Sequence, residues 1–279
     1  MVVRSPLSAI VVRCRTARRW ACGLGLAAGA LTRLDAETAP KSAWEDLQEW
    51  SFTEAARSFE EAGDEPASRL GLAVALLNLQ PRTADRLARA ERELSALADD
   101  ASVSPDLVAT ASYLLARIAE VHAFAPDPAR AAERYAALLA AHPQHPAAQT
   151  GASRLATLRL YRLGGDPLDT LAELEPLARQ LTDAGARRDF HLVLGRSYLF
   201  FGGERQRALE HLQSAMAAGI VAPTVRADVL AQIGELALEL NEPSISRRTW
   251  GEFVTTFPRD PRVDLIRQRL AALPEEARP

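Results

Sequence analysis

The sequence predicts an all-α fold, an α-solenoid in which antiparallel helix pairs stack along the chain. Hydrophobic residues make up 48% of the 279 residues and aromatic residues only 6%, so alanine and leucine, both strong helix formers, supply most of the apolar surface. Residues that favour strands are sparse. Small and large apolar residues also recur at helical spacing in successive segments, and proline or glycine separates these segments.

The first thirty residues differ from the rest of the chain. The run WACGLGLAAGA (20–30) is apolar and ends in small residues. Before it stand only basic charges, at Arg4, Arg13, Arg15, Arg18 and Arg19. Residues 1–30 are therefore typical of a secretory signal peptide, which predicts a periplasmic or secreted protein. The alternative is a disordered basic leader on a cytoplasmic protein. The run is shorter than the roughly 20 residues of a transmembrane helix.

Residues 31–40 are expected to be a linker. The only cysteines, Cys14 and Cys22, both lie in the leader. The remainder of the chain has no residue for a disulfide, a cysteine-ligated zinc site or a thiol nucleophile.

Two helix pairs are expected between residues 41 and 98. The segment FTEAARSFEEAGDEP (52–66) carries Ala55, Phe59 and Ala62 at helical spacing, and a less regular helix around Trp44 and Leu47 precedes it. Two more helices, 67–79 and 83–98, flank the break at Pro81.

The segment YLLARIAEVHAFAPDPARAAERYAALLAAHP (113–143) is the clearest pair. Its first helix is expected from about Ser112 to Phe124, with Leu115, Ile118, Ala119 and His122 on one stripe. Pro128 suits the first turn of the second helix, where a missing N–H costs little. That second helix carries Ala131, Tyr135 and Leu138 and stops at Pro143.

Three further pairs and a final helix complete the chain. Helices 147–163 and 167–183 flank Gly164-Gly165. In 194–216, Leu194, Gly195 and Tyr198 precede Ala208, Leu212 and Ala215. In 229–258, Leu230, Ile233, Gly234 and Ala237 precede Ser246, Trp250 and Phe253. Residues 262–273 predict an unpaired capping helix, and 274–279 a disordered tail.

These positions, read together over residues 41–273, resemble the tetratricopeptide repeat (TPR) family. The pattern is large, large, small on the first helix and small, aromatic, large on the second, with a period of about 34 residues. The resemblance implies a right-handed solenoid of about six helix pairs with a capping helix. It also implies a concave groove lined by the first helix of each pair.

The resemblance further implies which side chains line the groove, namely those one, four and five positions after the small residue of each first helix. These candidate partner-binding residues are Glu120, Phe124, Arg196, Leu199, Phe200, Glu235, Leu238 and Glu239. Aromatic rings beside charges would suit a peptide or protein partner.

No catalytic site is expected. The sequence has no G-x-S-x-G, H-E-x-x-H or phosphate-binding loop. His142 and His145 flank Pro143 but lack a third ligand nearby, so a turn between repeats is the better interpretation than a metal pair. Neither a metal nor a cofactor is predicted. The net charge of −3 does not indicate binding to a nucleic acid.

We therefore expect a non-enzymatic interaction scaffold or adaptor in the cell envelope, with no transmembrane span in the mature protein. Two alternatives remain open at this stage. One is an accessory glycan- or ligand-binding superhelix that serves a cell-wall enzyme, and the other is a cytosolic TPR regulator.

Overall fold

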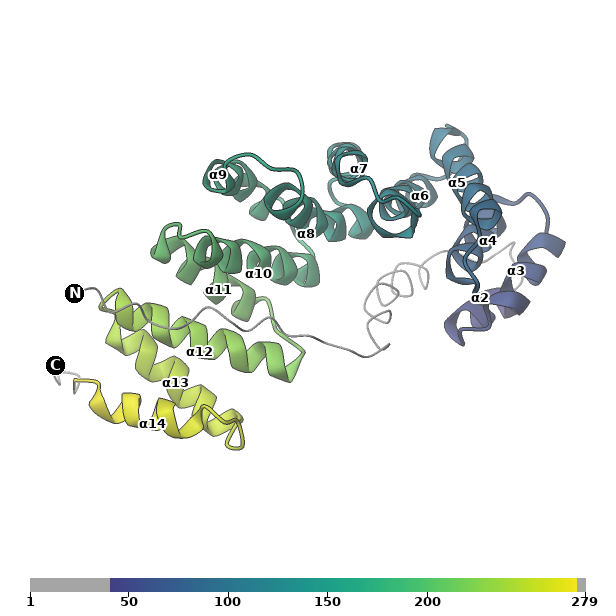
Figure 1. Cartoon of the computed structure of the whole chain (residues 1–279). Coiled ribbons are helices and arrows are strands. Elements are labelled where there is room, and N and C mark those ends of the chain that lie inside the picture. The colour runs from purple at the N-terminus through teal and green to yellow at the C-terminus, as the bar shows by residue number, and fades with distance from the viewer. Residues whose placement is uncertain (1–40, 275–279) are drawn as a thin grey trace. The chain divides into compact units, whose positions relative to one another are not determined.

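The computed structural model describes residues 41–274, and every regular element in that range is helical. The α-helices and one π-helix, η1, follow one another along the chain (Figure 1). Their bounds are Lys41–Gln48 (α2), Phe52–Glu61 (α3), Pro66–Asn78 (α4), Ala84–Asp99 (α5), Pro105–Arg117 (α6), Ile118–His122 (η1), Pro128–Ala141 (α7), Pro146–Tyr161 (α8), Pro167–Ala178 (α9), Ala184–Phe200 (α10), Arg205–Ala217 (α11), Pro223–Glu239 (α12), Pro243–Thr256 (α13) and Val263–Ala272 (α14). The all-α prediction is confirmed for this range.

Local sequence signals set many of the helix starts. Proline occupies the first turn of α4, α6, α7, α8, α9, α12 and α13, as predicted for Pro128. Side chains of Thr83, Asp127 and Asp183 accept hydrogen bonds from backbone N–H groups of the first turn that follows them. His145 caps α8 in the same way, so its predicted place in a turn between helices is confirmed.

The predicted helix Ser112–Phe124 is wrong at both ends. The helix begins at Pro105, because the Ser104 hydroxyl accepts the Leu107 N–H (3.5 Å) and Pro105 fits the first turn. Its α-helical part ends at Arg117, and the chain continues through the π-helix η1. Phe124 therefore lies in the turn after η1 and not in a helix.

The predicted helix 167–183 is also too long. Helix α9 ends at Ala178, and the next segment leads directly into α10. Leu181 is buried there, and the Asp183 side chain accepts the Ala186 N–H (2.7 Å) as the cap of α10. Leu181 and Asp183 are engaged in these contacts, so they are not available to extend α9.

Each helix packs against the helix that follows it, from α2 to α14. Even-numbered helices also contact one another, in the pairs α2–α4, α4–α6, α6–α8 and α8–α10. The short α9 leaves α8 in more extensive contact with α10 than with α9 itself.

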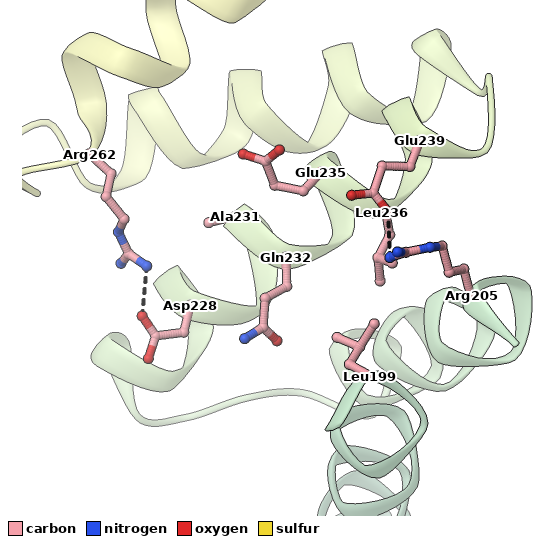
Figure 2. Close-up of a pocket in the computed structure, with 9 residues that line it drawn as sticks. All are labelled: Leu199, Arg205, Asp228, Ala231, Gln232, Glu235, Leu236, Glu239 and Arg262. Carbon is pink, nitrogen blue, oxygen red and sulfur yellow. Dashed lines mark hydrogen bonds and ion pairs between the residues drawn. The ribbon is translucent and has the colours of Figure 1, made fainter. Parts of the chain in front are cut away.

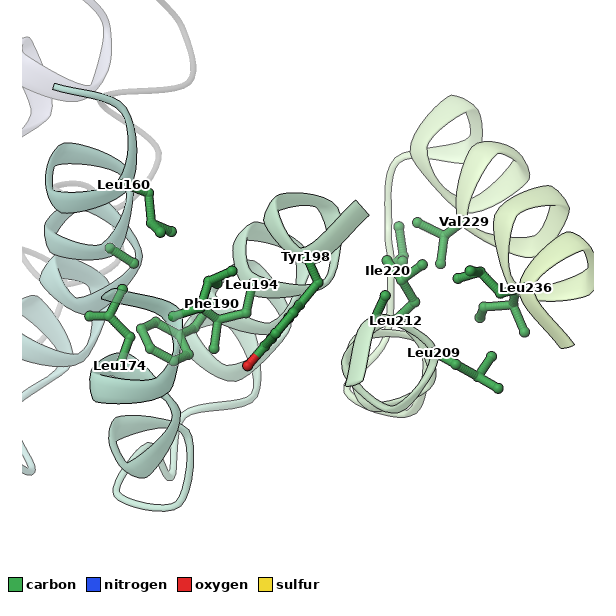
Figure 3. Close-up of a cluster of buried hydrophobic side chains, with 14 of the residues drawn as sticks. Leu160, Leu174, Phe190, Leu194, Tyr198, Leu209, Leu212, Ile220, Val229 and Leu236 are labelled. Carbon is green, nitrogen blue, oxygen red and sulfur yellow. The ribbon is translucent and has the colours of Figure 1, made fainter. Parts of the chain in front are cut away.

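Buried side chains link successive helices. One cluster runs from α8 to α12 and includes Leu160, Leu174, Phe190, Leu209 and Leu236 (Figure 3). A second cluster joins α12, α13 and α14 through buried apolar residues, namely Ala227, Leu230, Trp250, Phe253, Val263, Ile266 and Leu273. Neighbouring helices therefore share their apolar surface.

The predicted packing of large side chains on small residues is observed in the structure. Trp250 lies so near Gly234 that a Cβ there would fall 2.6 Å or less from three atoms of the indole ring. Leu212 packs in the same way on Gly195, in the preceding pair. At Gly234, only glycine allows this approach of two helices.

Several predictions lie outside the described residues. These are the leader 1–30, the linker 31–40 and the tail beyond residue 274.

Candidate functional site

A pocket of about 270 Å³ lies beside one face of α12. Residues of α12 line it at spacings of three or four, which places them on the same side of the helix. The remaining lining comes from the end of α10, the start of α11 and the residue before α14. The lining residues are Leu199, Arg205, Asp228, Ala231, Gln232, Glu235, Leu236, Glu239 and Arg262 (Figure 2).

Three predicted groove residues, Leu199, Glu235 and Glu239, meet in this pocket. They belong to two different pairs, on α10 and α12. The remaining lining residues were not predicted. The α12 members could have been found from their spacing, whereas Arg205 and Arg262 come from other elements and carry no local signal.

The acidic side chains around the pocket are paired. Arg205 reaches Glu239 (2.7 Å), and Arg262 reaches Asp228 (2.8 Å). Glu235 pairs with Arg269 of α14. The hydrogen bond with Asp260 raises the pKa of Arg262 above its usual range, and the same contact lowers the pKa of Asp260. The pocket wall thus has its charges balanced.

Gln232 is the exception among the polar lining residues. Its Oε1 atom is shielded from solvent and accepts no hydrogen bond from any residue in the described part of the chain. Figure 2 shows its side chain extending from α12 into the space beside Leu199. A buried amide oxygen without a partner costs free energy.

The other predicted residues of α10 and α12 lie outside this pocket. Arg196 and Leu238 are exposed. Phe200 is 73% exposed, at the end of α10. Its ring lies 5.8 Å from that of Tyr161 and 4.9 Å from that of Phe201.

Glu120 and Phe124 lie elsewhere, at η1 and in the turn after it. The carboxylate of Glu120 contacts Arg117 (2.8 Å) and Arg154 (3.3 Å), and the Tyr135 hydroxyl donates to it (2.7 Å). Burial alone would raise the pKa of Glu120, but the two arginines and the hydrogen bond from the Tyr135 hydroxyl together lower it. Phe124 is 60% exposed, and the Arg82 guanidinium lies 5.1 Å from its ring centre. The two residues do not share a pocket with the α12 site.

A second, larger hollow of about 500 Å³ lies among α3, α4 and α5. No predicted residue lines it. Three arginines and two acids do, namely Arg57, Arg86, Arg89, Glu60 and Asp85. The α12 pocket is the better candidate because Leu199, Glu235 and Glu239, which the sequence predicts for the groove, all line it.

Comparison with known protein families finds no family that matches this chain. A search among curated proteins finds no relative either. Between residues 41 and 274, no helix combines the length and hydrophobicity needed to cross a membrane. Within that range, no three His, Cys, Asp or Glu side chains are grouped so that they could hold a metal ion.

Proposed function

We propose that this chain is a TPR-like, right-handed α-solenoid that binds a segment of another protein and catalyses no reaction. The observation that carries the proposal is the convergence of Leu199, Glu235 and Glu239 on the α12 pocket. The register of the repeat pattern predicts these three residues for the groove. Contacts between successive even-numbered helices from α2 to α10 support a continuous surface over that part of the chain, of the kind that the repeat pattern implies.

The pocket favours a neutral, apolar side chain of the partner. Leu199, Ala231 and Leu236 supply apolar lining, while the acids at its rim already have arginine partners. A volume of about 270 Å³ suits one side chain better than a whole small-molecule ligand.

We further propose that the protein works in the cell envelope after removal of its leader. The basic residues and the apolar run 20–30 support this. N-terminal sequencing of the protein from its native host tests it. A terminus near residue 31 supports export, and a retained leader on a cytosolic protein contradicts it.

Peptide selection tests the binding function. Phage-displayed random peptides are selected on the immobilised protein, and the affinities of enriched peptides are measured by fluorescence anisotropy. Ala231→Leu fills the pocket without changing a charge, so we expect affinity to fall about tenfold or more. The matched control, Ala129→Leu, alters an exposed alanine of α7 and should change affinity less than about twofold.

Two results would refute this proposal. One is the absence of any enriched peptide. The other is a set of enriched peptides that bind Ala231→Leu as tightly as the unaltered protein, with both variants folded.

A further inference from the structure

Three arginines gather around η1 with a single carboxylate among them. Arg117 and Arg154 both contact Glu120. Arg82 reaches the same element from the loop before α5, where its Nη1 approaches the Val121 carbonyl oxygen at 3.5 Å. We call Arg82, Arg117 and Arg154 the arginine cluster.

The cluster has an excess of positive charge. Within the described range, Glu120 is the only carboxylate within 4 Å of any of the three guanidinium groups. The side chains of Arg117 and Arg154 are only 13% and 23% exposed, so solvent screens their charge less than at an open surface. Within this distance, the cluster therefore holds three positive charges and one negative charge.

The positive charge of the arginine cluster affects the pKa of His122, which lies on the same element. Burial lowers its pKa most, and the Arg117 and Arg82 charges lower it further, to about 4. His122 is therefore neutral at pH 7 and adds no charge of its own. A positive local potential disfavours the charged form of histidine and so lowers its pKa, which is the direction in which both arginines act.

Donors remain available in the cluster. A guanidinium carries five N–H groups. Arg117 uses Nη1 toward Glu120, and Arg154 uses Nε toward the Tyr113 hydroxyl (3.1 Å) and Nη1 toward Glu120. The remaining nitrogens of both have no acceptor among residues 41–274. The exposed ring of Phe124 lies beside the third arginine, Arg82, whose guanidinium is 5.1 Å from the ring centre, and offers an apolar contact.

We propose that the arginine cluster and Phe124 bind an acidic segment of a partner protein, with carboxylates against the arginines and an apolar side chain against the ring. The proposal rests on the proposed function and adds the chemistry of the partner. A protein partner is favoured over a nucleic acid because the basic groups form one small cluster, in a chain with a net charge of −3. An Arg–carboxylate contact of this kind is strong when partly shielded from water.

Fluorescence anisotropy with defined peptides tests the proposal. The probe is a labelled peptide of six glutamates, one leucine and one phenylalanine. Matched probes carry glutamine or lysine in place of glutamate, and a short oligothymidylate serves as the nucleic-acid arm. We expect the glutamate peptide to bind about tenfold or more tightly than the glutamine peptide, and to weaken as NaCl is raised.

Two variants shift the charge in opposite directions. Arg82→Gln removes a guanidinium that holds no carboxylate, and should weaken the glutamate peptide about three- to tenfold. Glu120→Gln removes the competing carboxylate and should tighten binding by a similar factor, about three- to tenfold. Arg162→Gln, at an exposed arginine without an ion pair in the described range, is the matched control and should change nothing.

Circular dichroism shows whether each variant is folded. If Glu120→Gln does not fold, the effect of Arg82→Gln on peptide binding alone tests the proposal. Equal binding of the glutamate and glutamine peptides, or equal effects of Arg82→Gln and Arg162→Gln, would overturn the proposal. Tighter, Arg82-dependent binding of the oligothymidylate would also overturn it. If selected library peptides bind without acidic preference, only this inference fails, whereas binding of no peptide at all removes the proposed function too.

Discussion

At the scale of single residues, the closest contacts are those of a large side chain on a glycine. Trp250 is fully buried and covers Gly234. Tyr135 meets Gly151 of the next helix, and Phe59 meets Gly71. Packing of a large side chain on a glycine therefore joins helices within a pair and between pairs. Gly195 and Gly234 were recognised in the sequence, whereas Gly71 and Gly151 lie in helices whose repeat pattern is degenerate.

Removing the indole of Trp250 tests this packing. Trp250→Ala leaves a cavity between α12 and α13, because a glycine backbone cannot collapse into the space. We expect the free energy of unfolding to fall by about 3–5 kcal/mol. Urea denaturation followed by circular dichroism measures the change.

Trp50→Ala is the matched control, since Trp50 is 55% exposed. It should cost less than about 1 kcal/mol. Equal effects of the two substitutions would show that Trp250 does not join these helices.

Residue types alone could predict only part of the candidate site. Leu199, Glu235 and Glu239 were found from the register of the repeat and converge on the pocket. Arg205 and Arg262 belong to the starts of other elements, so their contribution depends on how the helices pack. Glu120 was predicted to line a groove, but the partners Arg117 and Arg154, which decide its chemistry, were not anticipated.

At the scale of elements, the start and stop signals explain most helix bounds. Proline in the first turn was read correctly at Pro128, and the breaks at Pro81 and Gly164-Gly165 lie between helices. The start of α6 was missed although Ser104-Pro105 is a capping signal. The π-helix η1 carries no such signal, and its Glu120 contacts Tyr135 of α7 and Arg154 of α8.

The π-helix should also be sensitive to acid. His122 has a pKa of about 4 in the folded protein, against about 6.5 in an unfolded chain. Between these values the unfolded state binds more protons, so the free energy of unfolding falls as pH is lowered from 6.5 toward 4. Allowing for partial solvent screening, we expect about 1–2 kcal/mol from His122.

Urea denaturation at pH 7 and pH 4.5 measures this effect for the unaltered protein, His122→Gln and His142→Gln. His122→Gln should lose less stability between the two pH values than the unaltered protein. His142→Gln, at a partly exposed residue after α7, should keep the full difference. An unchanged difference in His122→Gln would contradict the assignment.

At the scale of the whole molecule, stability is expected to come from neighbours and not from one central core. Residues 41–274 belong to one unit by their contacts, and each helix from α2 to α14 packs against its neighbours along the chain. The sequence could predict this because the apolar stripe of each pair is too wide to leave in water. It could not predict that the short α9 brings α8 and α10 into extensive direct contact, since that depends on where α9 ends.

The solenoid itself is the claim on which the binding proposals depend, and small-angle X-ray scattering of residues 36–279 tests it most directly. A compact domain of this size would have a radius of gyration of about 18 Å. Stacked helix pairs predict a value above about 22 Å and an asymmetric distance distribution. A radius near about 18 Å with a symmetric distribution would contradict the stack.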